Sequence, residues 1–199
     1  SFLQAGFYRT ALIIGSECLS NLVNWQDRGT CILFGDGAGA AVLRAESGNG
    51  YLPTAHSDGK KGAALKCKSP FDGDMENQRF HPEEYKMPMD GQEVFKFAVR
   101  QVPAVIMEVL EKNTLVPEDI DWMILHQANS RIVEAVSRHL KVPLAKFPMN
   151  MQEYGNTSSA SIPILLDEMN RDGRLKKGQK IILAGFGAGL TWGASILEW

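Results

Sequence analysis

A glycine-rich segment occurs twice in this 199-residue sequence, and it limits the folds that the chain can adopt. Residues 35–39 are Gly-Asp-Gly-Ala-Gly and residues 185–189 are Gly-Phe-Gly-Ala-Gly, 150 positions later (185 − 35). An apolar run flanks each copy on both sides, which is the pattern of two strands joined by a turn. Two such units predict a duplicated α/β fold whose first half is incomplete. The alternative is two independent glycine-rich hairpins.

The same glycines resemble part of the fingerprint of dinucleotide-binding folds. That fingerprint requires a helix directly after the glycine turn, because the helix N-terminus binds the pyrophosphate. Each turn here leads into a predicted strand instead, so the sequence disfavours a dinucleotide cofactor.

Periodicity predicts alternating strands and helices. The predicted strands are 10–15, 30–34, 40–44, 121–125, 180–184 and 194–198, and the predicted helices are 93–112, 130–140 and 161–170. Residues 46–90 lack a clear period, and we expect them to form a long irregular excursion. The start of the chain resembles the last turn of a helix that ends at Gly6, so we expect a piece of a longer chain. We therefore divide the chain into the remainder of an N-terminal half (1–45), the excursion (46–90) and a C-terminal half (91–199).

Composition excludes several classes of protein. The chain is 44% hydrophobic and 22% charged, as soluble globular proteins are, and its net charge of −2 argues against nucleic acid as a partner. No apolar run approaches the ~20 residues of a membrane span, so no membrane association is expected. Cys18, Cys31 and Cys67 form an odd set without a CxxC pair, so neither a disulfide framework nor a metal site is expected. We expect a cytoplasmic protein.

His126 and Asn156 are the strongest candidates for site residues. His126 follows a buried strand, and Asn156 lies in a turn before a predicted helix. Side chains at the carboxyl ends of strands line ligand crevices in α/β folds, and both residues supply N–H donors for a developing oxyanion. A histidine of this kind can also be an ordinary core residue. No cysteine, serine or lysine lies in a convincing nucleophile motif.

Four motifs then occur in order: residues 34–42, 126–129, 155–161 and 185–193. Together they resemble the β-ketoacyl-[acyl carrier protein] synthase III family of thiolase-fold condensing enzymes. The resemblance implies a duplicated βαβαβαββ fold in α-β-α-β-α layers, usually a homodimer, with the active site between the halves. It implies that an acyl-CoA primer, acetyl-CoA in the first instance, condenses with malonyl-[acyl carrier protein] by decarboxylative Claisen condensation to start fatty-acid synthesis. No cofactor is implied, because CoA and the carrier protein's phosphopantetheine are parts of the substrates.

The resemblance also assigns the catalytic groups. A nucleophilic cysteine is expected about a dozen residues before Ser1, so we expect this chain alone to be inactive. Cys18 follows a strand but is not expected to replace that nucleophile. His126 and Asn156 would donate hydrogen bonds to the malonyl thioester carbonyl. Ala188, where many relatives have glycine, would lend its backbone N–H to an oxyanion hole, and Phe186 would pack beside the nucleophile.

Binding residues follow less directly from the resemblance. Arg28 would stack on the adenine of CoA. Gln92 stands where relatives often have an asparagine that contacts pantetheine, and Asn129 is a second candidate for that contact. The segment expected to meet the carrier protein consists of Gln127, Ala128, Asn129, Ser130 and Arg131. A basic strip that suits an acidic partner comprises Arg131, Arg138, His139, Lys141 and Lys146. A solvated helix face would have the same composition.

Two other function classes stay open. One is a related thiolase-fold enzyme that condenses polyketide, quinolone or long-chain substrates with the same histidine and asparagine. The other is a non-catalytic thiolase-fold subunit that contributes only an interface.

Overall fold

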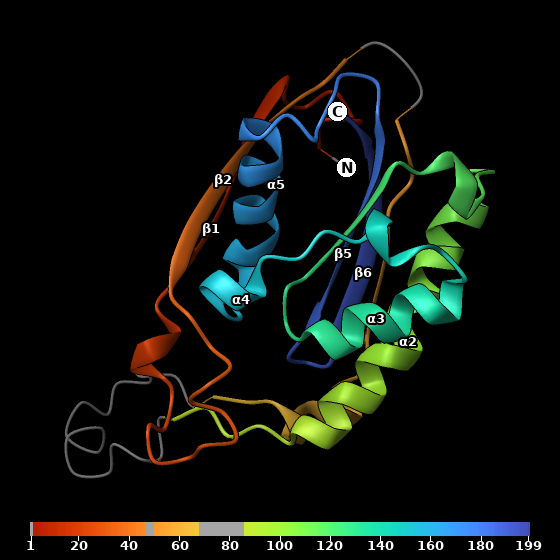
Figure 1. The fold of residues 1–199 in the computed structure, drawn as a ribbon. Coiled ribbons are helices and arrows are strands. Elements are labelled where there is room, and N and C mark those ends of the chain that lie inside the picture. The colour runs from red at the N-terminus through yellow and green to blue at the C-terminus, as the bar shows by residue number, and fades with distance from the viewer. Residues whose placement is uncertain (1, 47–49, 68–85) are drawn as a thin grey trace.

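Two β-sheets with a helix between them organise the fold (Figure 1). A computed structural model describes residues 2–46, 50–67 and 86–199. Strands β1 (Thr10–Glu17) and β2 (Gly37–Arg44) form one sheet. The other has the order β3-β6-β5-β4, from β3 (Thr54–Ser57), β4 (Trp122–Leu125), β5 (Lys180–Gly187) and β6 (Thr191–Glu198). No helix in the described ranges is long and apolar enough to cross a membrane.

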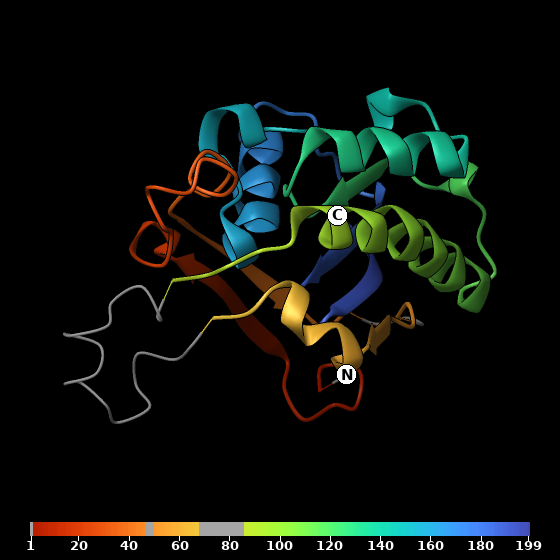
Figure 2. The same ribbon diagram turned by 90° about the horizontal axis from the view of Figure 1, so that it is seen from below.

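The helices form the remaining layers. Helix α5 (Ser161–Arg171) lies between the two sheets, while α2 (Gly91–Lys112) and α3 (Ser130–Leu140) cover the other face of the four-stranded sheet (Figures 1 and 2). The remaining helical elements are the short α4 (Met151–Tyr154) and 3₁₀ turns at Leu19–Asn21, Gly59–Ala64, Pro117–Asp119, Leu144–Lys146 and Ser158–Ala160. This sequence of layers, sheet–helix–sheet–helix, confirms the predicted α/β class.

The glycine repeat predicted the correct strand pair in its second copy and an incorrect pair in its first. The pair β1–β2 is antiparallel from Thr10↔Arg44 to Glu17↔Gly37, and the pair β5–β6 is antiparallel over eight residues of each strand in the same way. The predicted strand 30–34 is wrong. Its backbone is used in local turns instead, because Cys31 and Leu33 donate N–H bonds to carbonyls only three or four residues earlier. The partner of β2 is therefore β1.

The glycines of the first copy serve close packing. A Cβ added at Gly37 or Gly39 would lie 2.9 Å from Ile164 or Pro163 of α5. That separation is shorter than heavy-atom contact allows. At Gly39 the Cβ would meet the Ile164 backbone nitrogen as well as Pro163, so α5 approaches β2 this closely only because residue 39 is glycine. On its other side, α5 buries Leu165 and its apolar neighbours against β4 and β5. The central helix is thus fixed from both sheets.

The excursion 46–90 is not wholly irregular. It contains β3, which pairs with β6 and forms an edge of the four-stranded sheet, and the 3₁₀ helix Gly59–Ala64. Residues 47–49 and 68–85 of the excursion lie outside the described residues. Leu65 bridges Met89, and the Asp90 N–H donates to the Ala64 carbonyl at 2.8 Å. Period-based prediction missed β3 because a four-residue strand carries too short a pattern.

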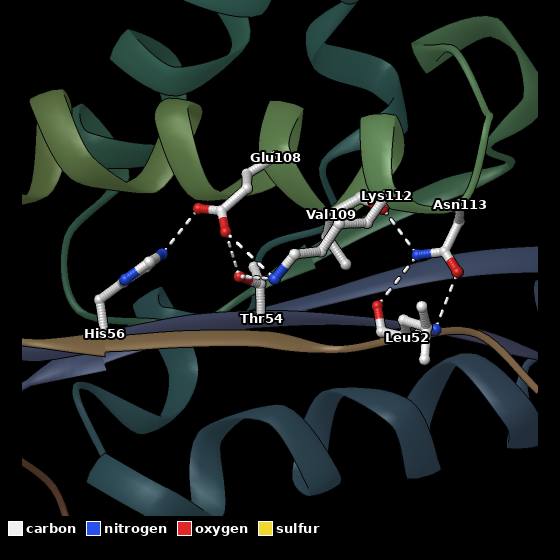
Figure 3. A network of polar contacts seen from close by, with 7 residues as sticks. All are labelled: Leu52, Thr54, His56, Glu108, Val109, Lys112 and Asn113. Carbon is white, nitrogen blue, oxygen red and sulfur yellow. Dashed lines mark hydrogen bonds and ion pairs between the residues drawn. The ribbon is translucent and has the colours of Figure 1, made fainter.

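A polar network fastens β3 to α2 (Figure 3). The Glu108 carboxylate accepts from Thr54 Oγ1 at 2.6 Å and contacts His56 Nε2 at 2.6 Å. Lys112 Nζ donates to Thr54 Oγ1 at 3.0 Å and lies 3.2 Å from Glu108. These hydrogen bonds and ionic contacts hold the Glu108 pKa at about 2, below its usual value. The network adds side-chain contacts to a four-residue edge strand that pairs with β6 on one side.

Residues 2–7, where the sequence predicts the end of a helix at Gly6, form turns with the hydrogen bonds of a Schellman-type cap, and no helix is assigned to these described residues. The Phe7 N–H donates to the Phe2 carbonyl and the Gly6 N–H to the Leu3 carbonyl, both at 3.1 Å. Gly6 has φ +76°, the left-handed conformation that this cap requires.

Candidate active site

His126 lies at the carboxyl end of β4. Its N–H donates to the Ala184 carbonyl at 2.8 Å, so the parallel pairing of β4 with β5 continues to this residue. The apolar run of β4 is buried between α5 and the helices of the outer layer, and its burial fixes the strand end from which the imidazole projects. Position and element match the sequence-based expectation.

Asn156 is held by the first half of the chain. Its N–H donates to the Leu33 carbonyl at 2.7 Å, and its carbonyl accepts from the Gly35 N–H at 3.0 Å. The segments are pressed together: a Cβ on Gly35 would lie 2.0 Å from the Tyr154 carbonyl oxygen. Gly155 adopts φ +68° directly before the asparagine. The sequence folds this way because glycine stands at both points of close approach.

The orientation of the Asn156 amide follows from its contacts. Its Oδ1 accepts from the Ser158 N–H at 2.9 Å, which is an Asx turn. The Nδ2 group has no hydrogen-bond partner among the described residues. Asn156 therefore presents an unoccupied N–H donor whose direction is fixed by the local backbone.

The His126 ring has two close neighbours. Nδ1 lies 2.7 Å from Ser161 Oγ, and the ring meets Phe186 edge to face with centroids 5.3 Å apart. Burial lowers the pKa of His126 to about 4, although the residue keeps some solvent exposure. The imidazole is thus neutral at neutral pH. Sequence analysis included Ser161 only as part of a motif and gave it no role; its available signal was a hydroxyl at a predicted helix start.

Phe186 and Ala188 occupy the end of β5 and the turn that follows. Phe186 is buried, and its ring contacts the ring of His126. Ala188 is exposed, and its carbonyl accepts from Thr191 Oγ1 at 2.9 Å. Backbone bonds in both directions between Asp58 and Leu190, at 2.8 and 3.0 Å, hold the turn against the end of β3.

The structure corrects one member of the expected carrier-protein segment. Gln127 is 1% exposed, its Nε2 donates to the Leu125 carbonyl at 2.7 Å, and its Oε1 accepts from the Asn150 N–H at 3.1 Å. It stabilises the interior and does not lie at a docking surface. Asn129 caps α3 by accepting from the Arg131 N–H at 2.9 Å. Its neighbours Ala128 and Ser130 are partly exposed, and Arg131 is exposed.

The basic strip also loses one member. Lys146 Nζ donates to the Ile120 carbonyl at 2.5 Å, so its ammonium is tied to the protein. Arg138 lies 3.9 Å from Glu134 in an exposed pair. The exposed members of the strip are therefore Arg131, Arg138, His139 and Lys141.

Arg28 and Gln92 are exposed on separate segments. Arg28 lies in the turn 27–30, and Gln92 is the second residue of α2. In Figure 1 that turn and the start of α2 both lie toward the lower end of the molecule, where α3 also begins. Within the described chain, no hydrogen bond joins either residue to His126 or Asn156.

No hydrogen bond joins Cys18 or Cys31 to His126 in the described structure. Cys18 is exposed beyond the end of β1, where its Sγ accepts from Asn21 Nδ2 at 3.2 Å and lies 3.6 Å from Asp36. Cys31 is partly buried and Cys67 is exposed. In the ranges that the structure describes, no cluster of three His, Cys, Asp or Glu residues could hold a metal ion.

Comparison with known proteins gives two family matches. Residues 1–59 match the model of 3-oxoacyl-[acyl-carrier-protein] synthase III, and residues 110–199 match the model of its C-terminal part. β-Ketoacyl-[acyl-carrier-protein] synthase III of Clostridium novyi (strain NT) is 50% identical over 202 residues, which cover 100% of this chain and 61% of that protein. The protein of the same name from Synechococcus sp. (strain WH7803) is 47% identical over 206 residues, which cover 100% of this chain and 60% of that protein. The chain spans about three fifths of the length of these relatives.

Solved structures agree with the sequence matches. 3-Oxoacyl-[acyl-carrier-protein] synthase III of Aquifex aeolicus superposes with a TM-score of 0.89 at 39% identity, covering 100% of this chain and 60% of that one. The priming β-ketosynthase of the R1128 polyketide biosynthetic pathway superposes with a TM-score of 0.89 at 31% identity, covering 99% and 59%. These neighbours have the thiolase fold, which confirms the predicted fold class.

Proposed function

Because the chain belongs to the β-ketoacyl-[acyl carrier protein] synthase III family, we propose that the complete protein containing it is a condensing enzyme. It joins an acyl-CoA primer, acetyl-CoA in the first instance, to malonyl-[acyl carrier protein] with loss of CO₂. The observation that carries this proposal is the pair of neutral donors: the fixed Nδ2 of Asn156 and the uncharged imidazole of His126. Ser161, five residues after Asn156 in the sequence, contacts the ring of His126 and so connects the two donors.

The donors match the charge that develops in decarboxylation. When the bond to the carboxylate breaks, its electron pair moves into an enolate, and the thioester oxygen becomes negative. Preorganised N–H donors at such an oxygen lower the barrier, and each raises the rate by a factor on the order of 10²–10³. The enolate carbon then attacks the acyl thioester and forms the new C–C bond, while the thiolate leaves. The Ala188 N–H would stabilise the oxyanion of that second step.

The acyl thioester itself is proposed to form on a cysteine outside this chain. In the described structure, the contacts of Cys18 Sγ are to Ser20, Asn21 and Asp36, not to His126. This chain alone is therefore inactive in our proposal. Arg28, Gln92 and Asn129 are the proposed contacts for CoA and pantetheine, and Arg131 is the proposed contact for the acidic carrier protein.

We also propose that the complete protein is a cytoplasmic homodimer. Leu12, Ile14 and Val42 are 62%, 63% and 67% exposed, and they lie on one face of the β1–β2 sheet. An apolar face of this kind needs a cover in the complete protein.

Priming of a polyketide chain is the second candidate, because a priming β-ketosynthase of such a pathway superposes closely on the chain. The same donors would serve it, and only the acyl-CoA and carrier protein would differ. Rates with acetyl-CoA against longer or branched acyl-CoA, measured with the complete protein and its native carrier proteins, separate the two candidates.

The test of the proposed roles replaces the two donors in the complete protein. We expect His126→Ala and Asn156→Ala each to slow malonyl decarboxylation by about 10²–10³ and to affect acyl transfer from acyl-CoA much less. The double variant should lose less than the product of the two factors, because both donors serve one oxyanion. Labelled CO₂ release and intact-mass detection of the acyl-enzyme measure the two steps separately.

The matched control is Asn170→Ala, since this asparagine is exposed on α5. It should leave both steps unchanged. If Asn156→Ala abolishes acylation and spares decarboxylation, the assignment is wrong.

A further inference from the structure

We propose that Ser161 is a positioning residue that holds His126 in the tautomer with its proton on Nε2. The ring can then only donate a hydrogen bond at the nitrogen that remains free for substrate. This inference rests on the proposed role of His126 in stabilising the enolate, and it adds a residue that acts through the histidine.

The hydrogen bonds of Ser161 determine the direction of the contact. Ser161 is the first residue of α5 and is 2% exposed. Its Oγ accepts from the Gln127 N–H at 3.3 Å, which can only be a donor, and lies 2.7 Å from His126 Nδ1. The hydroxyl has one proton of its own. Among the described residues Nδ1 is the acceptor within reach of it, so the Oγ–H donates to Nδ1 and the ring proton lies on Nε2.

The opposite tautomer leaves a polar group unsatisfied. If Nδ1 carried the proton, Ser161 Oγ would accept from both Nδ1 and Gln127, and its own proton would have no acceptor among the described residues. A buried donor without a partner is disfavoured strongly enough to shift the tautomer ratio by tenfold or more, to order of magnitude. Ser161 thereby sets the tautomer even though it does not touch the reacting atoms.

Two further features keep the ring neutral and oriented. The ring meets Phe186 edge to face, which limits its rotation. Helix α5 begins at Ser161, so the positive end of its dipole lies beside Nδ1 and disfavours an imidazolium. A neutral ring with its proton on Nε2 stabilises an enolate and has no lone pair at Nε2 with which to take up a proton. His126 is therefore a hydrogen-bond donor in the reaction and not a general base.

The decisive measurement is the tautomer itself. Two-bond ¹H–¹⁵N spectra of the histidine side chains in the ¹⁵N-labelled complete protein distinguish a protonated from an unprotonated ring nitrogen, and the spectrum of His126→Gln identifies the signals of His126. We expect Nε2 to be protonated and Nδ1 to be unprotonated at pH 7.5. A predominant Nδ1–H form in the unaltered protein would overturn the inference.

Variants of Ser161 then connect the tautomer with the rate. Ser161→Ala should shift the ratio toward Nδ1–H and lower kcat of malonyl decarboxylation by roughly tenfold with KM little changed, since about one hydrogen bond is lost. Ser161→Thr keeps the hydroxyl and should restore both. Ser137→Ala is the matched control, because it removes another buried serine hydroxyl, bonded to the Val142 carbonyl at 2.7 Å. It should change neither the tautomer nor kcat.

The outcomes separate this inference from the proposed function. If Ser161→Ala leaves tautomer and kcat unchanged, the positioning role is refuted. If Ser161→Ala does not fold, the tautomer of the unaltered protein and the kcat of Ser161→Thr decide. If the complete protein does not decarboxylate malonyl thioesters at all, the proposed function fails, whereas an Nε2–H signal for His126 still supports the contact with Ser161.

Discussion

Lowering the pH should destabilise the complete protein through His126. Burial lowers the pKa of this ring to about 4 in the folded protein, whereas an unfolded histidine has a pKa of about 6.5. A folded-state pKa below the unfolded value means that the stabilising contribution is present above about pH 6.5 and is lost as the pH falls toward 4. The unfolded chain binds the proton in that range, and the folded protein does not.

The magnitude follows from the two pKa values. Proton linkage between a pKa of about 6.5 and one of about 4 amounts to about 2 kcal/mol at pH 5. His126 keeps some exposure to solvent, so we expect roughly 1–2 kcal/mol after screening at the exposed edge. His126→Gln cannot titrate. The difference in unfolding free energy between the unaltered protein and this variant should therefore change by that amount between pH 7.5 and pH 5, in the direction that favours the variant at low pH.

Urea unfolding followed by tryptophan fluorescence measures this difference at each pH. His139→Gln is the matched control, since it removes an exposed histidine near the end of α3. Its effect on the unfolding free energy should change by less than about 0.5 kcal/mol over the same range. If the effect of His126→Gln is the same at pH 7.5 and pH 5, the ring is not held neutral by its surroundings and the reasoning fails.

Three further predictions concern the stability of the protein and its binding of the carrier protein. Glu108→Gln should lower the unfolding free energy at pH 7 by only about 1 kcal/mol, because solvent screens the half-exposed network of Figure 3. This loss should vanish as the pH falls from about 4.5 to about 2, where the Glu108 carboxylate of the unaltered folded protein also becomes protonated. Gly35→Ala should cost about 2 kcal/mol or more in thermal or urea unfolding and reduce decarboxylation, because its Cβ would overlap the Tyr154 carbonyl that precedes the asparagine turn. Arg131→Glu should raise KM for the carrier protein in a salt-sensitive way and leave decarboxylation of a small malonyl thioester intact.

Each of these has a matched comparison. Glu111→Gln removes an exposed carboxylate from the same helix and should leave stability unchanged at every pH. Gly59→Ala adds a methyl group where nothing lies within 4 Å and should be tolerated. Lys141→Glu changes a nearby exposed charge and should affect carrier-protein binding less than Arg131→Glu. Equal effects of a variant and its comparison would contradict the corresponding argument.

The residues of the site followed from the sequence where a strong local pattern positions them. His126 ends an apolar run, and Asn156 follows a glycine in a turn before a helix, so both could be placed without coordinates. Helices α2 and α3 were predicted within two residues of their bounds, because their apolar stripes are long. In these cases the local pattern of apolar residues and glycine is enough to predict the structure.

Other features depend on contacts between distant segments. The run 30–34 has strand-like composition, but local turns compete for its backbone and β1 takes its expected place beside β2. The burial of Gln127 depends on the backbone of residue 150, and the contact of Ser161 with His126 spans 35 positions. No periodicity in the sequence encodes such pairings.

The bond from the Asp90 N–H to the Ala64 carbonyl, with the bridge between Leu65 and Met89 beside it, joins the end of the 3₁₀ helix Gly59–Ala64 to the start of α2. Asp58 caps the other end of the same 3₁₀ helix, and its backbone pairs with Leu190 in the turn after β5. One short helix therefore connects the start of α2 with the turn that contains Ala188. We expect a displacement of α2 to be transmitted to that turn, so the outer helical layer and the proposed oxyanion donor are mechanically coupled.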